Sequence, residues 1–335
     1  MFVPAYKLTY GNKLVDTTRE PRASALVELE IDLDIETPAD QCVAVFGRVG
    51  GLAPKRDEVV KIDLGYADNG GLVRVFTGAV TGIDRSLVST RVVAFAAANG
   101  LLRTFLDRTF ETKTAGGIVR ELAALAGVAL ANVDEGIAFP AYVIDGRRNV
   151  YRHIRALADL CGFDAYIAPD GKLVFEAFVA GHALHTFDFG KDILALDVFD
   201  RPPDANATQA FGESPTGSAG ADAWPWLTKD FGGSKGVAGS GKPLALLERS
   251  ALRTSDASRI AAKAAQAARA NRVRTGRLTT FGRPQIKLGD ALAIRSVPEA
   301  ALNATFQVRA IRHRITKSGG FTTEVNFRGP IGAGT

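Results

Sequence analysis

The chain has 335 residues, of which 46% are apolar and 23% charged, and its formal net charge is +5. This composition excludes a disordered or collagen-like chain, and the length allows two or three domains with their own cores. No run of about 18 apolar residues exists, so we expect no membrane insertion. Residues 1–13 lack a signal-peptide pattern, and only Cys42 and Cys161 carry thiols. We therefore expect folding in a reducing cytoplasm without a disulfide framework.

Charge is unevenly distributed along the chain. Residues 248–335 contain 16 Lys and Arg against 5 Asp and Glu, a net charge of +11, so the remainder carries −6. Such asymmetry is typical of a nucleic-acid surface or of a basic region that faces an acidic partner or lumen. Because the charges are scattered over strands, they favour the second interpretation.

Apolar and acidic residues alternate from Val27 to Glu36, and the pattern over 25–36 predicts a long half-buried antiparallel strand. The apolar face comprises Ala25, Val27, Leu29, Ile31, Leu33 and Ile35, and the acidic face comprises Glu28, Glu30, Asp32, Asp34 and Glu36. The five carboxylates lie in a line instead of converging, so they favour a solvated or partner-facing strand over a cation site. Further strand patterns at 41–49, 58–64, 71–83 and 89–97, with glycines between them, predict a small barrel or sandwich.

Two helices follow in the middle of the chain. Apolar residues at helical spacing predict the first over 114–128, with Thr114 as N-cap and Gly127 as its stop. The second is predicted to begin after Asn149 and to end at Gly162. Next, Pro169-Asp170-Gly171 separates two apolar-alternating runs, 163–168 and 172–178, and this predicts a hairpin.

Residues 201–242 are rich in Gly, Ser, Pro and Asp, which predicts a long loop. Trp224 and Trp226 within it are candidates for a docking patch. An alanine-rich helix is predicted over 255–270, capped by Thr254 or Ser255. Strand patterns then follow at 272–280, 285–287, 291–296, 305–315 and 321–327, and the segment 305–330 resembles 75–100, which indicates an internal repeat.

The candidate chemical motifs favour structural interpretations. Residues 236–243, "GVAGSGKP", have phosphate-loop spacing, but Pro243 replaces the Ser or Thr that would hold magnesium, and the composition is that of a linker. His182 and His185 form at most half a metal site. His153 and Cys161 lie eight residues apart on one helix, about 12 Å along its axis, so they cannot pair as base and nucleophile.

Cys161 is predicted to pack on the apolar face of its helix, and Asp164 to lie on the polar face of the following strand. We therefore predict that the protein is not an enzyme and has no catalytic residue, metal or cofactor.

The order of these elements resembles the phage late control protein D family of contractile-tail baseplate hubs, which is related to the N-terminal part of type VI valine-glycine repeat protein G. The resemblance is carried by "VFTGAVTGI" (75–83), "LADLCGFDAYIAPDGKLVF" (157–175), "IKLGDALAI" (286–294) and "FQVRAIRHRITKSGGFTTEVNF" (306–327). It implies an α+β, mostly β fold in which two similar β-barrel domains bracket a helix-containing middle region. The expected divisions are a barrel at 1–105, an α+β domain at 106–200, a loop at 201–245, and a helix plus second barrel at 246–335. The two barrels can pack together.

The resemblance also implies a function. The expected protein is a homotrimeric ring that adapts the sixfold inner tube of a contractile tail, or of a phage-like injection system, to a threefold spike. Expected partners are further copies of the chain, a spike on a separate chain, inner-tube or tube-initiator proteins, baseplate wedge proteins and the tape measure protein. Assembly is expected in the bacterial cytoplasm, and the final location is the tail baseplate.

In such a ring we expect the acidic face of 28–36, together with Arg309 and Arg312 of the basic C-terminal segment, at lumen or subunit contacts. Two other functions stay open. A tail-associated peptidoglycan hydrolase needs an acidic pair in a cleft or a metal site, and a nucleic-acid-binding module would use the basic C-terminal half and bind DNA with a steep salt dependence.

Overall fold

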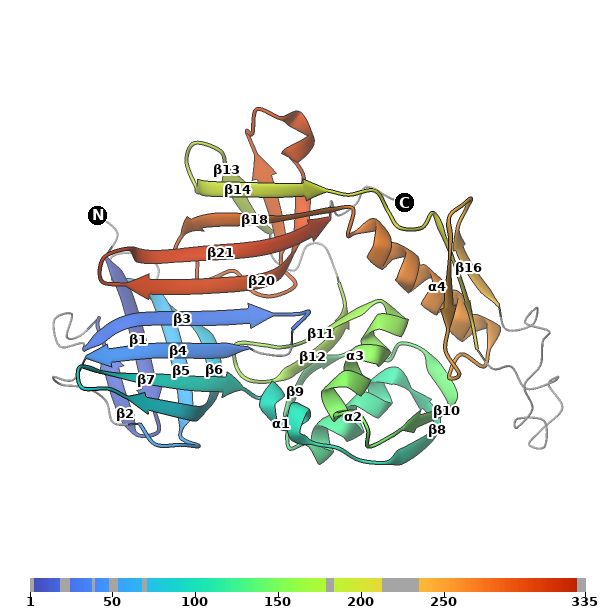
Figure 1. Cartoon of the computed structure of the whole chain (residues 1–335), viewed down its shortest axis with the longest axis horizontal. Helices are drawn as coiled ribbons and strands as arrows, with labels where there is room; N and C mark the ends of the chain where they lie inside the picture. The colour runs from blue at the N-terminus through green and yellow to red at the C-terminus, as the bar shows by residue number, and fades with distance from the viewer. Residues whose placement is uncertain are drawn as a thin grey trace.

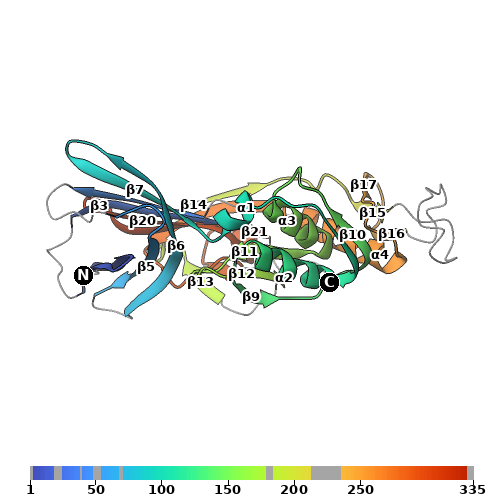
Figure 2. The ribbon, with the colours of Figure 1, turned by 90° about the horizontal axis from the view of Figure 1, so that it is seen from below.

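The computed structural model describes residues 3–18, 25–37, 40–47, 54–67, 71–178, 184–212 and 235–329. Trp224, Trp226 and His182 lie outside these ranges. The molecule is elongated, with the N-terminal strands at one end and the alanine-rich helix at the other (Figures 1 and 2). No helix in the described ranges combines the length and apolar character needed to cross a membrane.

Thirteen strands of the described chain form one sheet. The N-terminal half supplies β1 (Pro4–Tyr10), β2 (Lys13–Asp16), β3 (Leu26–Asp34), β4 (Gln41–Gly47), β5 (Val59–Tyr66), β6 (Gly71–Arg85) and β7 (Ser89–Ala96). The C-terminal half supplies β13 (Leu184–Asp188), β14 (Ile193–Asp200), β18 (Arg274–Phe281), β19 (Ala291–Arg295), β20 (Thr305–Thr316) and β21 (Gly320–Gly329), with a short 3-10 turn, η1 (Ala300–Leu302), between β19 and β20. The main order is β14-β18-β21-β20-β3-β4-β7-β6-β5-β1-β2.

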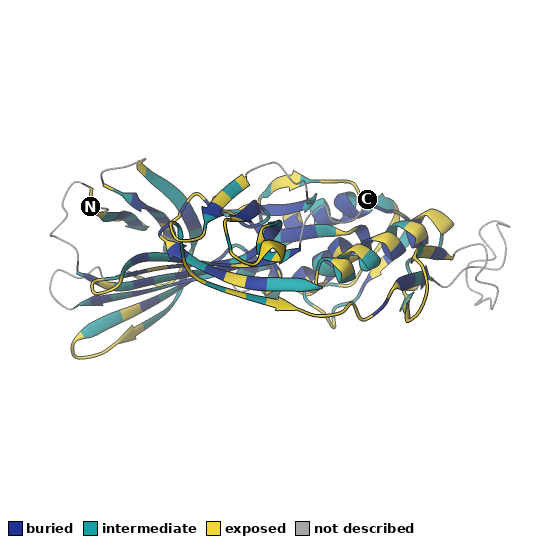
Figure 3. Ribbon diagram, turned by 90° about the horizontal axis from the view of Figure 1, so that it is seen from above, coloured by how far each residue is buried: buried dark blue, intermediate teal, exposed yellow. Residues whose placement is uncertain are grey.

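The two halves meet where β3 pairs with β20. The pairing is antiparallel, with Ile31 opposite His313 and Leu33 opposite Ile311. Both strands alternate between buried and partly exposed residues, and Figure 3 shows the same alternation along other strands. The predicted α+β, mostly β class is confirmed, whereas closure of either barrel and the domain divisions stay predictions.

The middle region contains two helices that begin and end as the sequence indicates. It comprises α1 (Ala98–Arg103), β8 (Arg108–Thr114), α2 (Ala115–Leu125), β9 (Leu130–Val133), β10 (Ala138–Ile144), α3 (Val150–Cys161), β11 (Phe163–Ile167) and β12 (Leu173–Ala177). Thr114 Oγ1 accepts from the Gly117 amide at the start of α2. The Asn149 side chain caps α3 in the same way, and Gly162 ends α3 in the left-handed conformation that glycine adopts without strain.

The predicted long loop at 201–242 is wrong for the described part of that segment. A small sheet forms there, with β15 (Ala207–Phe211) between β16 (Gly236–Gly239) and β17 (Leu244–Glu248). It packs on α4 (Ser255–Ala270), the predicted alanine-rich helix with Thr254 as N-cap. A Cβ atom on Gly236 would lie 2.1 Å from the Ser258 backbone, so the glycines and alanines that resembled a linker allow close packing of strand and helix.

Two further strand predictions are wrong in detail. Residues 285–287 form turns and not a strand. Val27 was expected on the buried face, but it is 43% exposed and Leu26 is buried instead. A register shift in the pairing of β3 with β4 falls between Leu26 and Glu28, and such a bulge reverses the inward and outward alternation on one side of it.

Candidate functional site

The exposed side of the β3–β20 pair carries a ladder of ion pairs, which we call the charge ladder: Glu28, Glu30 and Asp32 of β3 with Arg312 and Arg314 of β20. Arg312 Nε lies 2.5 Å from Asp32 Oδ1, and Arg314 Nη2 lies 2.6 Å from Glu28 Oε1. The acidic face predicted from the sequence is thus neutralised by the same chain. None of these carboxylates lies in the apolar core, and their place at a lumen or subunit contact stays a prediction.

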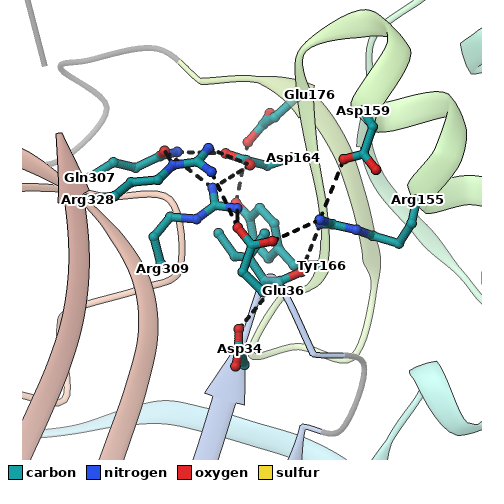
Figure 4. Close-up of polar contacts among 11 residues, drawn as sticks. Asp34, Glu36, Arg155, Asp159, Asp164, Tyr166, Glu176, Gln307, Arg309 and Arg328 are labelled. Carbon is teal, nitrogen blue, oxygen red and sulfur yellow. Dashed lines mark hydrogen bonds and ion pairs between the residues drawn. The ribbon is translucent and has the colours of Figure 1, made fainter. Parts of the chain in front are cut away.

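The charge ladder continues into a buried charge cluster where β3 ends. We define this cluster as the buried or largely buried Asp164, Gln307, Arg309 and Arg328 together with Glu36, whose side chain is 41% exposed, joined by Arg155 from α3 (Figure 4). The side chains of Arg309 and Asp164 are only 7% and 8% exposed, and Arg309 Nη1 donates to Asp164 Oδ1 at 2.5 Å. The second Arg309 nitrogen, Nη2, donates to Glu36 Oε1. One guanidinium therefore links the end of the large sheet to the middle region.

Asp164 was predicted on the polar face of its strand, and that face is buried in the structure, where Asp164 is 6% exposed. Gln307 Nε2 donates to its Oδ2 at 2.6 Å, and Arg309 occupies its Oδ1. The strand alternation places Asp164 correctly on the face opposite the ring of Phe163, but the sheet covers that face. A buried carboxylate needs such charged and hydrogen-bonded partners because desolvation of an isolated charge is costly.

Glu36 contacts three arginines from three elements. Besides Arg309, its carboxylate lies 3.2 Å from Arg155 Nη2 and 3.3 Å from Arg328 Nη1. Burial by itself would raise the pKa of Glu36, but the arginines, led by Arg309, lower it overall. Burial would likewise lower the pKa of Arg309, whereas Asp164 and Glu36 raise it overall. Both groups are held in their charged forms.

Positive charge is in excess around the cluster, since three arginines, Arg155, Arg309 and Arg328, contact two carboxylates, Glu36 and Asp164. Burial, followed by repulsion from Arg309, lowers the pKa of Arg328 to about 10, and Arg272 adds to this repulsion. Arg155 also donates from Nη1 to the Ile35 carbonyl at 2.8 Å, which holds the end of β3 against α3. Every carboxylate of the cluster is bound by an arginine, and arginines outnumber carboxylates. The geometry is therefore that of a structural contact between the sheet and the middle region.

Part of this arrangement was predictable from the sequence. Glu36 and Arg309 were predicted as interface residues, and the structure brings them together inside one chain. Arg155, Asp164, Gln307 and Arg328 were missed as partners. Arg309 is a case where alternation alone misleads, since a register shift between Val308 and Ala310 in the β20–β21 pairing interrupts the alternation at this residue.

Asp34 and Asp40 have local roles next to the cluster. The Asp34 carboxylate accepts from the Glu36 amide at 2.7 Å, and the Asp34 amide donates to Asp40 Oδ1 at 2.8 Å. Asp40 is 4% exposed, and burial raises its pKa to about 8. Both carboxyl groups thus accept backbone amides where β3 ends and fix the conformation of the chain there.

The cysteine and histidine residues that resemble a catalytic site are packed separately. Cys161 is buried on α3 and accepts from the Ile137 amide at 3.4 Å, and burial raises its pKa to about 11, so the thiol stays protonated. The His153 ring bonds to the Asp145 carbonyl, and His185 bonds to Asp290 at 2.9 Å. Among the described residues, no three His, Cys, Asp or Glu side chains group to hold a metal ion.

Comparison with known proteins gives a likeness of fold over the whole length. No protein-family model and no curated protein matches the sequence. The structure is similar to a 43 kDa tail protein of prophage MuSo2 from Shewanella oneidensis, with a TM-score of 0.73 at 13% identity over 97% of this chain and 98% of that one. It is equally similar to a tail protein from Neisseria meningitidis, with a TM-score of 0.72 at 16% identity over 98% and 97% of the two chains.

A more distant likeness is to the Escherichia coli c3393 protein, a component of the type VI secretion system, with a TM-score of 0.60 at 10% identity over 98% of this chain and 77% of that one. The predicted resemblance to tail hub proteins is therefore confirmed at the level of fold: the chain has the fold of phage tail proteins and of a type VI secretion component.

Proposed function

We propose that the chain is a structural baseplate hub of a contractile tail or phage-like injection system. In this proposal three copies form a ring that adapts a sixfold inner tube to a threefold spike carried on a separate chain. The observation that carries the proposal is the full-length fold likeness to two tail proteins, which spans at least 97% of both partners in each comparison. Fold alone does not assign function, so the site must agree with it.

The site supports a structural role. Charged side chains that are deeply buried in other proteins often serve catalysis, but the cluster carboxylates Glu36 and Asp164 are both bound by Arg309. A glycosidase needs one carboxylic acid with a raised pKa to protonate its leaving group. The pKa of Glu36 is lowered, and Asp159, whose pKa is raised by burial, lies 3.7 Å from Arg155 Nη2. The contacts of the buried charge cluster join the end of β3 to β20, β21 and α3. Such contacts suit a rigid component of an assembly.

The two similar halves of the large sheet also suit a ring in which each chain contributes two similar units. Each half of the large sheet contains one long hairpin, β6–β7 in the N-terminal half and β20–β21 in the C-terminal half, and each hairpin has one register shift. Three copies would then present six similar units around an axis, which can contact a sixfold tube on one side and a threefold spike on the other. Inner-tube, tube-initiator, wedge and tape measure proteins are the further partners proposed, at the tail baseplate, after assembly in the cytoplasm.

Mass in solution tests the proposal. Light scattering on the purified chain at several concentrations is expected to give a trimer of about 107 kDa, three times the 35.5 kDa chain, and electron microscopy is expected to show threefold rings. The purified chain is expected to have no activity on peptidoglycan. A monomer at all concentrations that degrades peptidoglycan would refute the proposal.

A further inference from the structure

Two adjoining cavities lie where the large sheet meets α3 and α4. The first, of about 630 Å³, lies between α3, α4 and the sheet, and the second, of about 670 Å³, lies over β14, β18 and β21. They share five lining residues: Glu36, Arg201, Arg272, Arg309 and Arg328. We call the combined cavity the arginine trough.

The lining of the arginine trough is strongly cationic. Seven arginines and four carboxylates line the first cavity, a net charge of +3. Arg155, Arg309 and Arg328 are paired with carboxylates of the buried charge cluster, and Arg269 Nε lies 3.1 Å from Asp204. Pairing inside the trough therefore accounts for four of the seven arginines.

The remaining three are Arg201, Arg249 and Arg272. All three side chains are exposed, and none takes part in an ion pair with any residue that the structure describes. Arg277, which lines the second cavity, is already paired with Asp197 at 3.0 Å. The excess positive charge of the trough thus resides on three guanidinium groups without an ion-pair partner in the described ranges, of which Arg249 donates to the Glu248 carbonyl at 2.9 Å. The pKa of Arg328 is lowered by burial and, after burial, by repulsion from Arg309 and Arg272.

We propose that the arginine trough binds an acidic segment of a partner protein, whose carboxylates pair with Arg201, Arg249 and Arg272. Guanidinium groups pair with carboxylates through two parallel hydrogen bonds, and a cleft lined by one sign of charge draws in an oppositely charged ligand. The inference concerns a surface of the single chain and does not depend on the trimeric ring.

The walls of the trough favour a polypeptide over a nucleic acid. Phe199 is 55% exposed in the second cavity, and one side of the first is formed by alanines of α4 with Pro202 and Pro203. These apolar surfaces suit side chains of a peptide. Carboxylates of Asp159 and Asp204, which are 71% and 74% exposed at the first cavity, would repel a continuous phosphate backbone, whereas a peptide can place neutral residues beside them.

Fluorescence anisotropy with defined probes tests this inference. The full chain is titrated against a labelled peptide of four Asp-Glu-Leu repeats, against the matching Asn-Gln-Leu peptide, and against a labelled single-stranded DNA of equal charge. We expect the acidic peptide to bind, with affinity that falls as salt rises from about 50 to 300 mM because the contacts are exposed. The neutral peptide is expected not to bind.

Variants locate the binding. The triple variant R201S/R249S/R272S is expected to weaken acidic-peptide binding about tenfold or more, since each exposed ion pair contributes modestly. A matched control, R56S/R85S/R295S, removes three exposed arginines that line neither cavity, and it is expected to bind like the parent. The reversed variant R201E/R249E/R272E is expected to bind a Lys-Lys-Leu peptide instead.

Three results would overturn the inference. One is that the acidic peptide binds the triple variant and the parent equally. The second is that the DNA binds more tightly than the peptide and loses affinity in the triple variant, which would make the trough a nucleic-acid site. The third is that the triple variant changes the oligomeric state measured by light scattering, which would make another copy of the chain the occupant.

Discussion

Replacing Arg309 with methionine tests whether the buried charge cluster holds the molecule together. Methionine replaces the aliphatic stem of the arginine side chain but removes the guanidinium that bonds to Asp164 and Glu36. Asp164 is 8% exposed, so the variant leaves a buried carboxylate without its principal cation. Removing one partner of a buried ion pair costs about 3–5 kcal/mol, and we expect R309M to lower the free energy of unfolding by this amount.

The matched control is R312M, three residues along the same strand. Arg312 is 50% exposed in the charge ladder, where an ion pair contributes about 0–1 kcal/mol. Urea unfolding followed by circular dichroism at pH 7 compares the two variants with the parent. A further variant, D164N/R309M, should regain part of the loss, because it no longer buries an unpaired charge. Equal losses below about 1 kcal/mol for R309M and R312M would refute the reasoning.

Three further predictions concern buried groups and close packing. His313 is 1% exposed, and burial lowers its pKa to about 3. As the pH falls, the unfolded chain therefore binds a proton at this histidine before the folded chain does. The free energy of unfolding should then fall by about 1.4 kcal/mol per pH unit below about pH 6. Urea midpoints between pH 7 and 4 should slope less in H313Q, and an unchanged slope would contradict this. Burial raises the pKa of Asp40 to about 8, so the free energy of unfolding should decline as the pH rises from 4 to 8. D40N should therefore be more stable than the parent by at least about 1 kcal/mol at pH 8 and not at pH 4. G236V should separate β16 from α4, seen as faster hydrogen exchange in both, whereas G82A, whose nearest neighbouring atom would lie 3.6 Å away, should exchange like the parent.

The local structure was largely predictable because it is determined by short-range rules. Thr114, Asn149 and Thr254 cap their helices as expected, since a side-chain oxygen next to free amides acts within one turn. The hairpin at Pro169-Asp170-Gly171 forms for the same kind of reason. Composition misled at 236–239, where glycines allow contact with α4 and do not mark a linker. The same residue type serves both purposes, so only the packing distinguishes them.

The candidate site was less predictable because its parts come together only through long-range pairing. Glu36 and Arg309 are 273 residues apart, and their contact follows from the register in which β3 lies against β20. Asp164 joins them from a third segment, and nothing in its neighbourhood along the chain indicates that the sheet will cover it. Sequence alternation identified the charged faces, but it could not identify which faces would meet.

The charge asymmetry of the sequence therefore has two different consequences. In the charge ladder, Arg312 lies opposite Asp32, and a slip of one residue would turn the carboxylates of β3 into the core and expose Ile31. Complementary charge there acts within the chain, where it favours one register between the two halves. Charge that is satisfied internally has little left to attract a partner, so the acidic strand is a weaker candidate for docking than its composition indicates. The exposed guanidinium groups of Arg201, Arg249 and Arg272 form no ion pair with any carboxylate in the described structure, and for this reason the arginine trough is the better candidate for a docking site.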